Sequence, residues 1–312
     1  MNPFDTADRT SVVVATRSRP ELLEVAVQSV LGQDHPGEIE VVVVFDQCEP
    51  DLGLAAEWDT GRHAGRRRVR VVTNTRTPGL AGARNSGIAT ATGALLAFCD
   101  DDDAWLPAKL RRQVDAMAHT GAGLSACGIE IVVGHRRHVR VPRHGDVTPE
   151  NLARRRVMEA HPSTIVVRRD AFGRIGWVDE DIPGSYAEDY DWMLRAVALE
   201  PIAVVSEPLV RVLWHPGSFF STRWQTTIDA LDYCVAKHAA LRNNPRGLAR
   251  IYGQKAFAYA ALGARSEARH WAWESLRLSP RERRSYLALA VSTGLLPAAT
   301  VVRAANARGR GI

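Results

Sequence analysis

A short apolar run that ends in four consecutive carboxylates constrains this chain more than any other feature. Residues 94–99 are apolar, and Asp100, Asp101, Asp102 and Asp103 follow them directly. A run of this length before a polar cluster predicts a buried strand that ends in a loop. Ligands of open α/β sheets bind beyond the carboxyl ends of the strands, and a divalent cation relieves repulsion between adjacent carboxylates. A solvated acidic loop, or a helix N-terminus where aspartate is favoured, explains the acidic run alone equally well.

Strand-like and helix-like segments alternate through the N-terminal third of the chain. Runs rich in valine predict strands at residues 11–15, 38–45 and 68–73. Apolar residues recur with helical period after Pro20, and the small-residue segment 79–90 predicts a second helix. This alternation predicts an α/β fold with a mostly parallel sheet flanked by helices.

The rest of the chain mixes both kinds of segment and then becomes helical. After Arg223 the pattern is helical throughout, and residues 252–280 resemble a single tetratricopeptide-type helix hairpin, which we interpret as an appendage. Before it we expect a helix at 106–119, a strand at 124–133, an exposed hairpin or loop at 134–145, a buried strand at 163–167, a helix that opens at 188 and strands at 202–205 and 209–214.

Composition argues against several classes of protein. The net charge is +5, and the arginine clusters lack interleaved aromatic residues, which weakens a nucleic-acid interpretation. The four cysteines are scattered without CxxC spacing, so we expect reduced thiols in a cytoplasmic protein. Residues 1–10 lack the apolar region of a secretion signal, and no run of about 18 apolar residues could span a bilayer.

The basic C-terminal tail, residues 297–312, leaves two explanations open. It combines Val301 and Val302 with three arginines, a composition compatible with contact to the anionic inner face of the cell membrane. A solvated helix end is the commoner explanation of such a tail. The oligomeric state stays open at this point.

Five blocks of residues resemble family 2 glycosyltransferases with the GT-A fold. The blocks occur in the family's order over about two thirds of the chain: SVVVATRSRPELL from residue 11, VVVFD ending at 46, the segment 79–87 with ARNSG, FCDDDDAWLP from 98 and EDYDWMLR from 188. The transferase function follows from this resemblance, since periodicity alone predicts only an α/β sheet with a carboxylate cluster.

The resemblance also implies a division of the chain into domains. Residues 1–222 would form a GT-A, Rossmann-like glycosyltransferase domain. Its nucleotide-sugar-binding half would be 11–103 and its acceptor half 104–222, followed by a C-terminal helical extension at 223–312.

The nucleotide pocket is assigned by the resemblance to residues that follow the first strands. Thr16 and Arg17 would line it, and the Asp46 carboxylate would accept a hydrogen bond from the imide N–H of a uracil-type base. The family often has a second aspartate where this chain has Gln47, so a UDP-sugar is favoured without being fixed. Arg84 would reach the base or a phosphate; an arginine on a helix surface is the alternative.

The acidic run corresponds to the family's Asp-x-Asp motif. Asp102 would bind Mg²⁺ or Mn²⁺, and Asp100 would hold the ribose or the sugar. The ion would bridge the diphosphate and neutralise charge as it leaves. The extra Asp101 leaves the frame ambiguous by one residue, and Asp103 would contact the donor sugar or cap the next helix. His215 would face the diphosphate or the metal; an ordinary loop histidine is the alternative.

Transfer needs a base for the acceptor hydroxyl, and the family places it at a Glu-Asp pair. We therefore predict Asp189 as the base and Glu188 as the second candidate, with a structural cap as the alternative role for either. The dipole of the helix that opens here would keep Asp189 ionised. Direct displacement by the acceptor oxygen would invert the anomeric centre.

The implied protein is an inverting glycosyltransferase that moves a sugar from a nucleotide-diphosphate sugar to a saccharide or lipid-linked acceptor in glycan biosynthesis. The basic loop 135–144 indicates an anionic acceptor or a membrane face. The alternatives are an enzyme that tailors a small natural product and a catalytically degenerate scaffold that binds partners. Intact Asp100, Asp102 and Asp189 disfavour the scaffold, and the absence of GxGxxG after the first strand disfavours a dinucleotide oxidoreductase.

Overall fold

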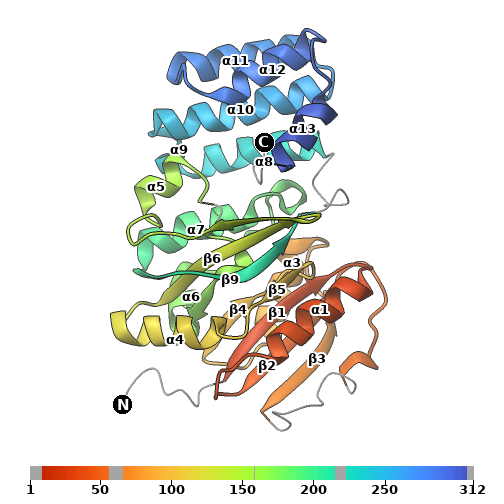
Figure 1. Cartoon of the computed structure of the whole chain (residues 1–312), viewed down its shortest axis with the longest axis vertical. Coiled ribbons are helices and arrows are strands. Elements are labelled where there is room, and N and C mark those ends of the chain that lie inside the picture. Colours follow the sequence, from red (N-terminus) through yellow and green to blue (C-terminus); the bar gives the residue numbers. More distant parts are fainter. Residues whose placement is uncertain (1–8, 56–65, 158, 215–222, 308–312) are drawn as a thin grey trace.

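The structure is a computed structural model that describes residues 9–55, 66–157, 159–214 and 223–307. Figure 1 shows a twisted sheet with helices packed on it and, at one end of the molecule, a stack of helices formed by the C-terminal part of the chain. The predicted domain boundary at residue 222 lies outside the described residues.

One sheet contains all the strands of the described chain. Its order is β3-β2-β1-β4-β8-β6-β9-β5, and β7 pairs with the outer part of β6. The pairs β1–β2, β1–β4 and β2–β3 are parallel, as the alternating pattern predicts, whereas β8, β5 and β7 pair antiparallel with their neighbours. The bounds are β1 Thr10–Thr16, β2 Ile39–Phe45, β3 Arg67–Thr73, β4 Leu95–Phe98, β5 Asp103–Trp105, β6 Leu124–Val133, β7 Arg136–Arg140, β8 Val166–Arg168 and β9 Ile202–Leu213.

Two hydrophobic cores explain why the inner strands are apolar on both faces. Along β2, Val41 and Val43 belong to the core under α1 and α4, whereas Val42 and Val44 belong to the core under α3, α6 and α7. A strand that is covered on both faces has a continuous run of apolar residues. The helices of this region are α1 Pro20–Leu31, α3 Leu80–Thr90, α4 Lys109–Thr120, α5 Pro149–Arg154, η1 Pro162–Thr164, α6 Arg169–Ile175, η2 Pro183–Ser185 and α7 Glu188–Leu199.

Two strand predictions in the second half of the sheet are wrong in detail. Residues 163–167 do not form one strand, because Pro162 begins a 3-10 turn whose first residues are held by the His161 side chain, so β8 starts only at Val166. The two strands expected at 202–205 and 209–214 are the single strand β9, in which Pro208 lies opposite Gly128 at a shift of register. A bulge of this kind lets one strand continue through a proline. The exposed hairpin predicted at 134–145 is confirmed by the pairing of β7 with β6.

The C-terminal part of the chain is helical and has a core of its own. Small residues fill the contacts between its helices, including Ala256 and Ala260 on α10 and Ala268 and Ala272 on α11, so the predicted helix hairpin is confirmed. Among the described helices none is long and apolar enough to cross a membrane. The bounds are α8 Trp224–Lys237, α9 Ala239–Arg242, α10 Pro245–Ala261, α11 Arg265–Leu278, α12 Arg283–Ser292 and α13 Ala298–Asn306.

Helix α3 lies against the sheet more closely than a helix with larger side chains could. A Cβ atom at Gly87 would come within 2.4 Å of Cγ1 of Val13 and 3.0 Å of Cγ2 of Val44. Close approach of this kind explains the small-residue composition of α3. It also fixes the position of the polar residues on the same helix, among them Arg84.

We expect Gly87→Ala to lower the free energy of unfolding. Overpacking against two β-branched side chains costs about 1–3 kcal/mol, more than the roughly 1 kcal/mol that alanine gains in helix propensity. Gly173→Ala in α6 is the matched control, because a Cβ there meets no atom within 4 Å and stability should stay equal or rise. Urea unfolding of both variants checks this; equal stability would show that α3 does not depend on the close approach.

Candidate active site

The carboxyl ends of β1, β2 and β4 open into a cleft with a volume of about 710 Å³. Strand ends of a parallel sheet meet at one edge, which is why residues far apart in the sequence converge here. His215 lies outside the described residues. The other site residues predicted from the sequence all line this one cleft: Thr16, Arg17, Asp46, Arg84, Asp100, Asp101, Asp102, Asp103, Glu188 and Asp189.

Asp46, directly after β2, is fixed at one side of the cleft. Its carboxylate accepts the N–H of Gly79 at 3.1 Å and the Nδ2–H of Asn74 at 2.8 Å. Ser86 in turn donates to Oδ1 of Asn74 at 2.8 Å, which holds the amide in this orientation. Asn74 is not among the residues predicted from the sequence, although its place just after the predicted strand 68–73 is a usable signal.

The middle of the acidic run is held by Arg19. The Arg19 guanidinium lies 3.2 Å from Asp101 Oδ1 and 3.1 Å from Asp102 Oδ2. The Thr16 hydroxyl donates to Asp101 Oδ2 at 2.8 Å. Burial raises the pKa of Asp101 to about 6, although the Thr16 hydrogen bond opposes that rise. Asp101 therefore holds a proton at mildly acidic pH.

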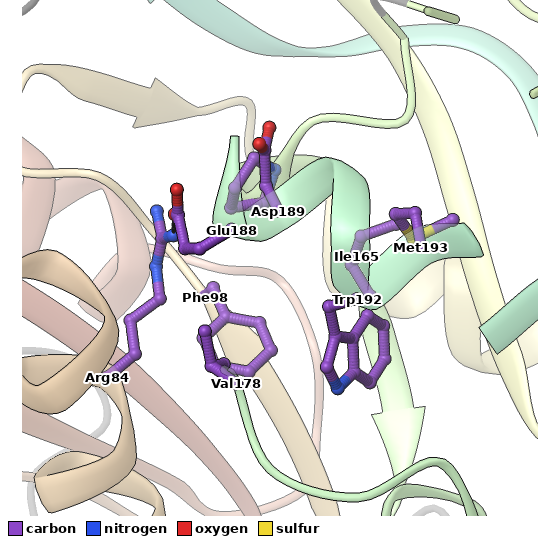
Figure 2. Close-up of a pocket in the computed structure, with 9 residues that line it drawn as sticks. Arg84, Phe98, Ile165, Val178, Glu188, Asp189, Trp192 and Met193 are labelled. Atoms are coloured by element: carbon purple, nitrogen blue, oxygen red, sulfur yellow. Dashed lines mark hydrogen bonds and ion pairs between the residues drawn. The ribbon is translucent and has the colours of Figure 1, made fainter. Parts of the chain in front are cut away.

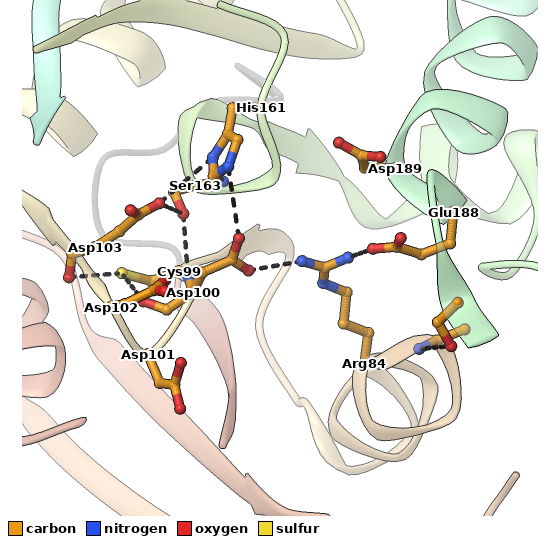
Figure 3. A network of polar contacts seen from close by, with 12 residues as sticks. Arg84, Cys99, Asp100, Asp101, Asp102, Asp103, His161, Ser163, Glu188 and Asp189 are labelled. Carbon is orange, nitrogen blue, oxygen red and sulfur yellow. Dashed lines mark hydrogen bonds and ion pairs between the residues drawn. The ribbon is translucent and has the colours of Figure 1, made fainter. Parts of the chain in front are cut away.

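The ends of the acidic run gather around His161, as Figure 3 shows. His161 Nε2 lies 3.6 Å from Asp100 Oδ2, and Nδ1 lies 3.4 Å from Asp103 Oδ2. The Ser163 hydroxyl donates to Asp103 at 2.5 Å, and its oxygen accepts the backbone N–H of Asp100 at 3.0 Å. Burial raises the pKa of Asp103 well above its usual range, and the charges of Asp100 and Asp102 add to the rise.

The donor set of Asp100, Asp103 and His161 fits a divalent cation. One ligand atom from each lies within 4.8 Å of the others. Two carboxylate oxygens and an imidazole nitrogen suit Mn²⁺ better than Mg²⁺, which prefers oxygen alone. The predicted metal ligand Asp102 lies beside this group and contacts Arg19 instead. His161 is not among the residues predicted from the sequence, because a lone histidine almost sixty residues downstream carries no signal of its own.

Arg84 and Glu188 form a buried ion pair at the other wall of the cleft. Arg84 contacts Glu188 through Nη1 and Asp100 through Nη2, the latter at 2.6 Å, and both Arg84 and Glu188 are buried. Figure 2 shows this pair above a small hollow lined by Phe98 and Val178. The alternative role of Arg84 as an arginine on a helix surface does not fit, because Arg84 is buried, faces the cleft and is enclosed by carboxylates.

Asp189, next to Glu188 in the first turn of α7, pairs with Arg156. The distance from Arg156 Nη2 to Asp189 Oδ2 is 2.5 Å. Burial works to raise the pKa of Asp189, but Arg156, His161, Arg84 and the backbone N–H of Tyr190 together outweigh it and lower the pKa below its usual value. Asp189 is therefore ionised at neutral pH. The ion pair with Arg156, a residue not predicted from the sequence, adds to the effect expected from the helix dipole.

Helix α7, which carries both candidate bases, is held by the C-terminal helices. Asp191 Oδ1 lies 2.7 Å from Nζ of Lys237 and 2.7 Å from Nε2 of His238. The Tyr190 hydroxyl accepts from Arg250 of α10 at 3.2 Å and donates to a backbone carbonyl of α5. Residues 223–307 thus contact the helix that lines the cleft and are packed against the sheet domain, unlike the separate appendage expected from the sequence.

Comparison with known families and structures identifies the class of protein. The family model described as "Glycosyl transferase family 2" matches residues 11–176, more than half of the chain. The chain belongs to this family, and the fold is the GT-A fold. The family resemblance expected from the sequence is confirmed.

Individual relatives are similar over parts of their length. The succinoglycan biosynthesis protein ExoO of Rhizobium meliloti is 32% identical over 146 residues, 45% of this chain and 39% of that protein. The Escherichia coli UDP-Glc:alpha-D-GlcNAc-diphosphoundecaprenol beta-1,3-glucosyltransferase WfaP is 29% identical over 107 residues, 34% of this chain and 40% of that protein. The chain thus matches about two fifths of the length of these two relatives.

Solved structures share the fold at low sequence identity. Residues 1–349 of S. aureus TarS, in complex with UDP-GlcNAc, match with a TM-score of 0.61 and 17% identity over 97% of this chain and 92% of that one. The mannosyltransferase PcManGT from Pyrobaculum calidifontis, in complex with GDP-Man and Mn²⁺, matches with a TM-score of 0.51 and 20% identity over 98% of this chain and 81% of that one. Both matches cover more of the chain than residues 1–222 do, so both extend into the C-terminal helices.

We expect Asp101→Asn to stabilise the metal-free protein only at higher pH. The folded-state pKa of Asp101 is raised to about 6, so the carboxyl favours the folded state most below its unfolded pKa. This contribution is lost as the pH rises from about 4 to about 6. The gain from Asp101→Asn should therefore be near zero at pH 4 and reach at most about 3 kcal/mol above pH 6.

Urea unfolding between pH 4 and pH 8 measures this difference. Asp170→Asn is the control of opposite sign, because hydrogen bonds from Arg168 lower the pKa of Asp170 to about 2 and favour its charged form. That variant should lose stability above pH 4. A pH-independent difference for Asp101→Asn would contradict a protonated Asp101 in the metal-free cleft.

Proposed function

We propose that this protein is a metal-dependent, inverting glycosyltransferase that moves a sugar from a nucleotide-diphosphate sugar to a saccharide or lipid-linked acceptor in glycan biosynthesis. The observation that carries the proposal is the single cleft lined by all the described residues to which the family resemblance gives a role. Asp46, the acidic run and Asp189 contribute to its walls, so a nucleotide, a diphosphate and a reacting hydroxyl can share one space.

The donor is bound at the ends of β1 and β2. Gly79, Asn74 and Gln47 already donate to the Asp46 carboxylate, so the imide N–H of a uracil base would take the place of the Gln47 amide on Oδ2. The TarS structure holds UDP-GlcNAc and the mannosyltransferase structure holds GDP-Man, so the shared fold accommodates both bases. The expected preference for uracil rests on Asp46. Because Gln47 stands where the family often has a second aspartate, binding of a purine nucleotide would replace the uracil assignment.

Asp100, Asp103 and His161 would hold the cation, with Asp102 within the same loop. A bound divalent ion would neutralise charge on the leaving diphosphate. The raised pKa of Asp103 supports this assignment, because buried carboxyls that crowd one another favour the charged form only when a cation joins them. The solved mannosyltransferase contains Mn²⁺.

Asp189 is the proposed base, since its carboxylate lines the cleft and is ionised. Its partner Arg156 lines the same cleft, and an acceptor hydroxyl that enters there would donate to the Asp189 carboxylate beside the arginine, which keeps that carboxylate charged. Glu188 is 3% exposed and bound to Arg84, which leaves it a positioning role. Attack by the acceptor oxygen opposite the diphosphate would invert the anomeric centre.

The names of two relatives support the proposed acceptor class. ExoO is named for succinoglycan biosynthesis, and WfaP is named for transfer to a sugar on diphosphoundecaprenol. Both names support a growing saccharide, free or lipid-linked, over a small natural product. Turnover with a soluble aglycone and none with saccharide acceptors would favour the natural-product alternative.

Nucleotide binding tests the donor and cation sites together. We expect one of UDP, GDP and dTDP, with UDP favoured, to bind far more tightly with Mn²⁺ than without it in calorimetry. His161→Ala should weaken the Mn²⁺-dependent affinity at least about tenfold, since a lost ligand costs no less than a lost outer-shell partner. His119→Ala, at the exposed end of α4, is the matched control and should bind as the unmodified protein does.

Three results would count against these sites. Equal affinity with and without Mn²⁺ would remove the cation from the donor site. An unchanged affinity in His161→Ala would place the cation elsewhere in the acidic loop. No binding of any nucleotide to folded protein would favour the degenerate scaffold.

Replacement of the base tests the catalytic assignment. Asp189→Asn should retain nucleotide affinity and lose about 10²–10⁴ in kcat, because only proton transfer to the base is removed. Release of UDP from a UDP-sugar with a panel of saccharide and lipid-diphosphate acceptors measures turnover. Asp181→Asn, an exposed loop variant outside the cleft, is the control. Full turnover by Asp189→Asn would exclude this residue as the base.

A further inference from the structure

The two parts of the chain carry opposite net charge. Residues 223–312 contain 15 lysines and arginines against 5 acidic residues, a net charge of +10. Residues 1–222 contain 25 against 30, a net charge of −5. A strong charge asymmetry between the parts of one chain is typical of proteins that bind an anionic surface or polymer through the basic part.

Part of this charge forms a continuous face on α11. Arg265, Arg269, Trp273 and Arg277 follow one another at intervals of four residues, so they lie along one side of the helix. All are exposed: the Trp273 residue is 60% exposed and the Arg277 side chain 72%. We call these residues the outer face of α11.

The opposite side of α11 fixes the direction of this face. Ala268, Ala272 and Ser275 are fully buried, and Ser275 bonds to the backbone of α10 and to the Ser285 hydroxyl of α12. Figure 1 shows α11 in the outermost layer of the helical stack, at the end of the molecule farthest from β3. The outer face of α11 therefore points away from the protein.

The face carries three arginines, and two glutamates on the same helix offset part of their charge. Glu274 pairs with Arg277 at 2.7 Å, and Glu267 lies exposed at the edge of the face. Arg281 and Arg283, in the turn that follows α11 and at the start of α12, are exposed and add positive charge at the same end of the helix.

We propose that the outer face of α11 binds the surface of an anionic lipid bilayer. An indole ring prefers the boundary between lipid headgroups and acyl chains, and an exposed tryptophan flanked by arginines matches that boundary. Arginine side chains lay their aliphatic stems on apolar surface and place the guanidinium among lipid phosphates. We thus assign to α11 the membrane contact that the sequence allowed for the tail 297–312. This proposal is independent of the proposed donor site.

Vesicle binding tests this proposal without any measurement of activity. The full chain should sediment with vesicles that contain phosphatidylglycerol and stay in solution with vesicles of phosphatidylcholine alone. Binding should weaken steeply between about 0.05 M and about 0.5 M salt, because screening shortens the range of the attraction.

Charge reversal tests the position of the contact. Each arginine near an anionic surface contributes about 1 kcal/mol, which is about fivefold in partitioning. The double variant Arg265→Glu/Arg269→Glu should therefore lose at least about 25-fold. The control Arg112→Glu/Arg174→Glu changes the net charge equally on side chains that are 50% and 51% exposed in the sheet domain, and it should bind as before.

Two further variants separate α11 from other surfaces. Trp273→Ala should weaken binding several-fold, whereas Trp177→Ala, a 47% exposed tryptophan of the sheet domain, should not. Arg303→Glu in α13 should have a small effect. The proposal is overturned if anionic and neutral vesicles bind equally, if both double variants bind alike, if only Arg303→Glu loses binding, or if soluble heparin binds and vesicles do not. Melting curves confirm that each variant is folded.

Discussion

The ion pairs of Arg84 connect the two walls of the cleft. One guanidinium contacts Asp100 after β4 and Glu188 at the start of α7. Loss of one partner of a buried pair leaves a buried charge and costs about 3–5 kcal/mol, so this arrangement fixes the distance between the acidic loop and α7. Arg84 itself is positioned because α3 lies close against the sheet at Gly87. The packing of one small-residue helix therefore sets the geometry of the candidate site.

Charge compensation also decides which carboxylates are ionised. Several positively charged groups offset the burial of Asp189 and lower its pKa, whereas burial and the charges of neighbouring carboxylates raise the pKa values of Asp101 and Asp103. A base must be ionised, which matches the lowered pKa of Asp189. A bound cation stabilises carboxylates that would otherwise repel one another, which matches the raised pKa values in the acidic run. The C-terminal helices take part, since Arg250 bonds to Tyr190 on the same helix as Asp189.

The fold and most of the site were predictable because they depend on local patterns. Valine-rich runs and helical periods fix the alternating elements, and every described site residue predicted from the five blocks lines the cleft. Errors fell where a single residue changes the backbone: Pro162 begins a 3-10 turn within an apolar run, and Pro208 lies at a register shift inside one long strand. Periodicity averages over several residues and does not register such events.

The sequence by itself determined the GT-A class, through the five blocks, and the carboxylates at the strand ends, which meet because the strands are parallel. Only the tertiary structure decided which positively charged and hydrogen-bonding groups lie beside these carboxylates. Arg156, His161 and Asn74 lie outside the recognised blocks, and long-range packing brings them to Asp189, Asp100 and Asp46. The attachment of α7 to the C-terminal helices was decided in the same way. Electrostatic partners act through space, and no spacing along the chain records which distant side chains will be a few ångströms apart.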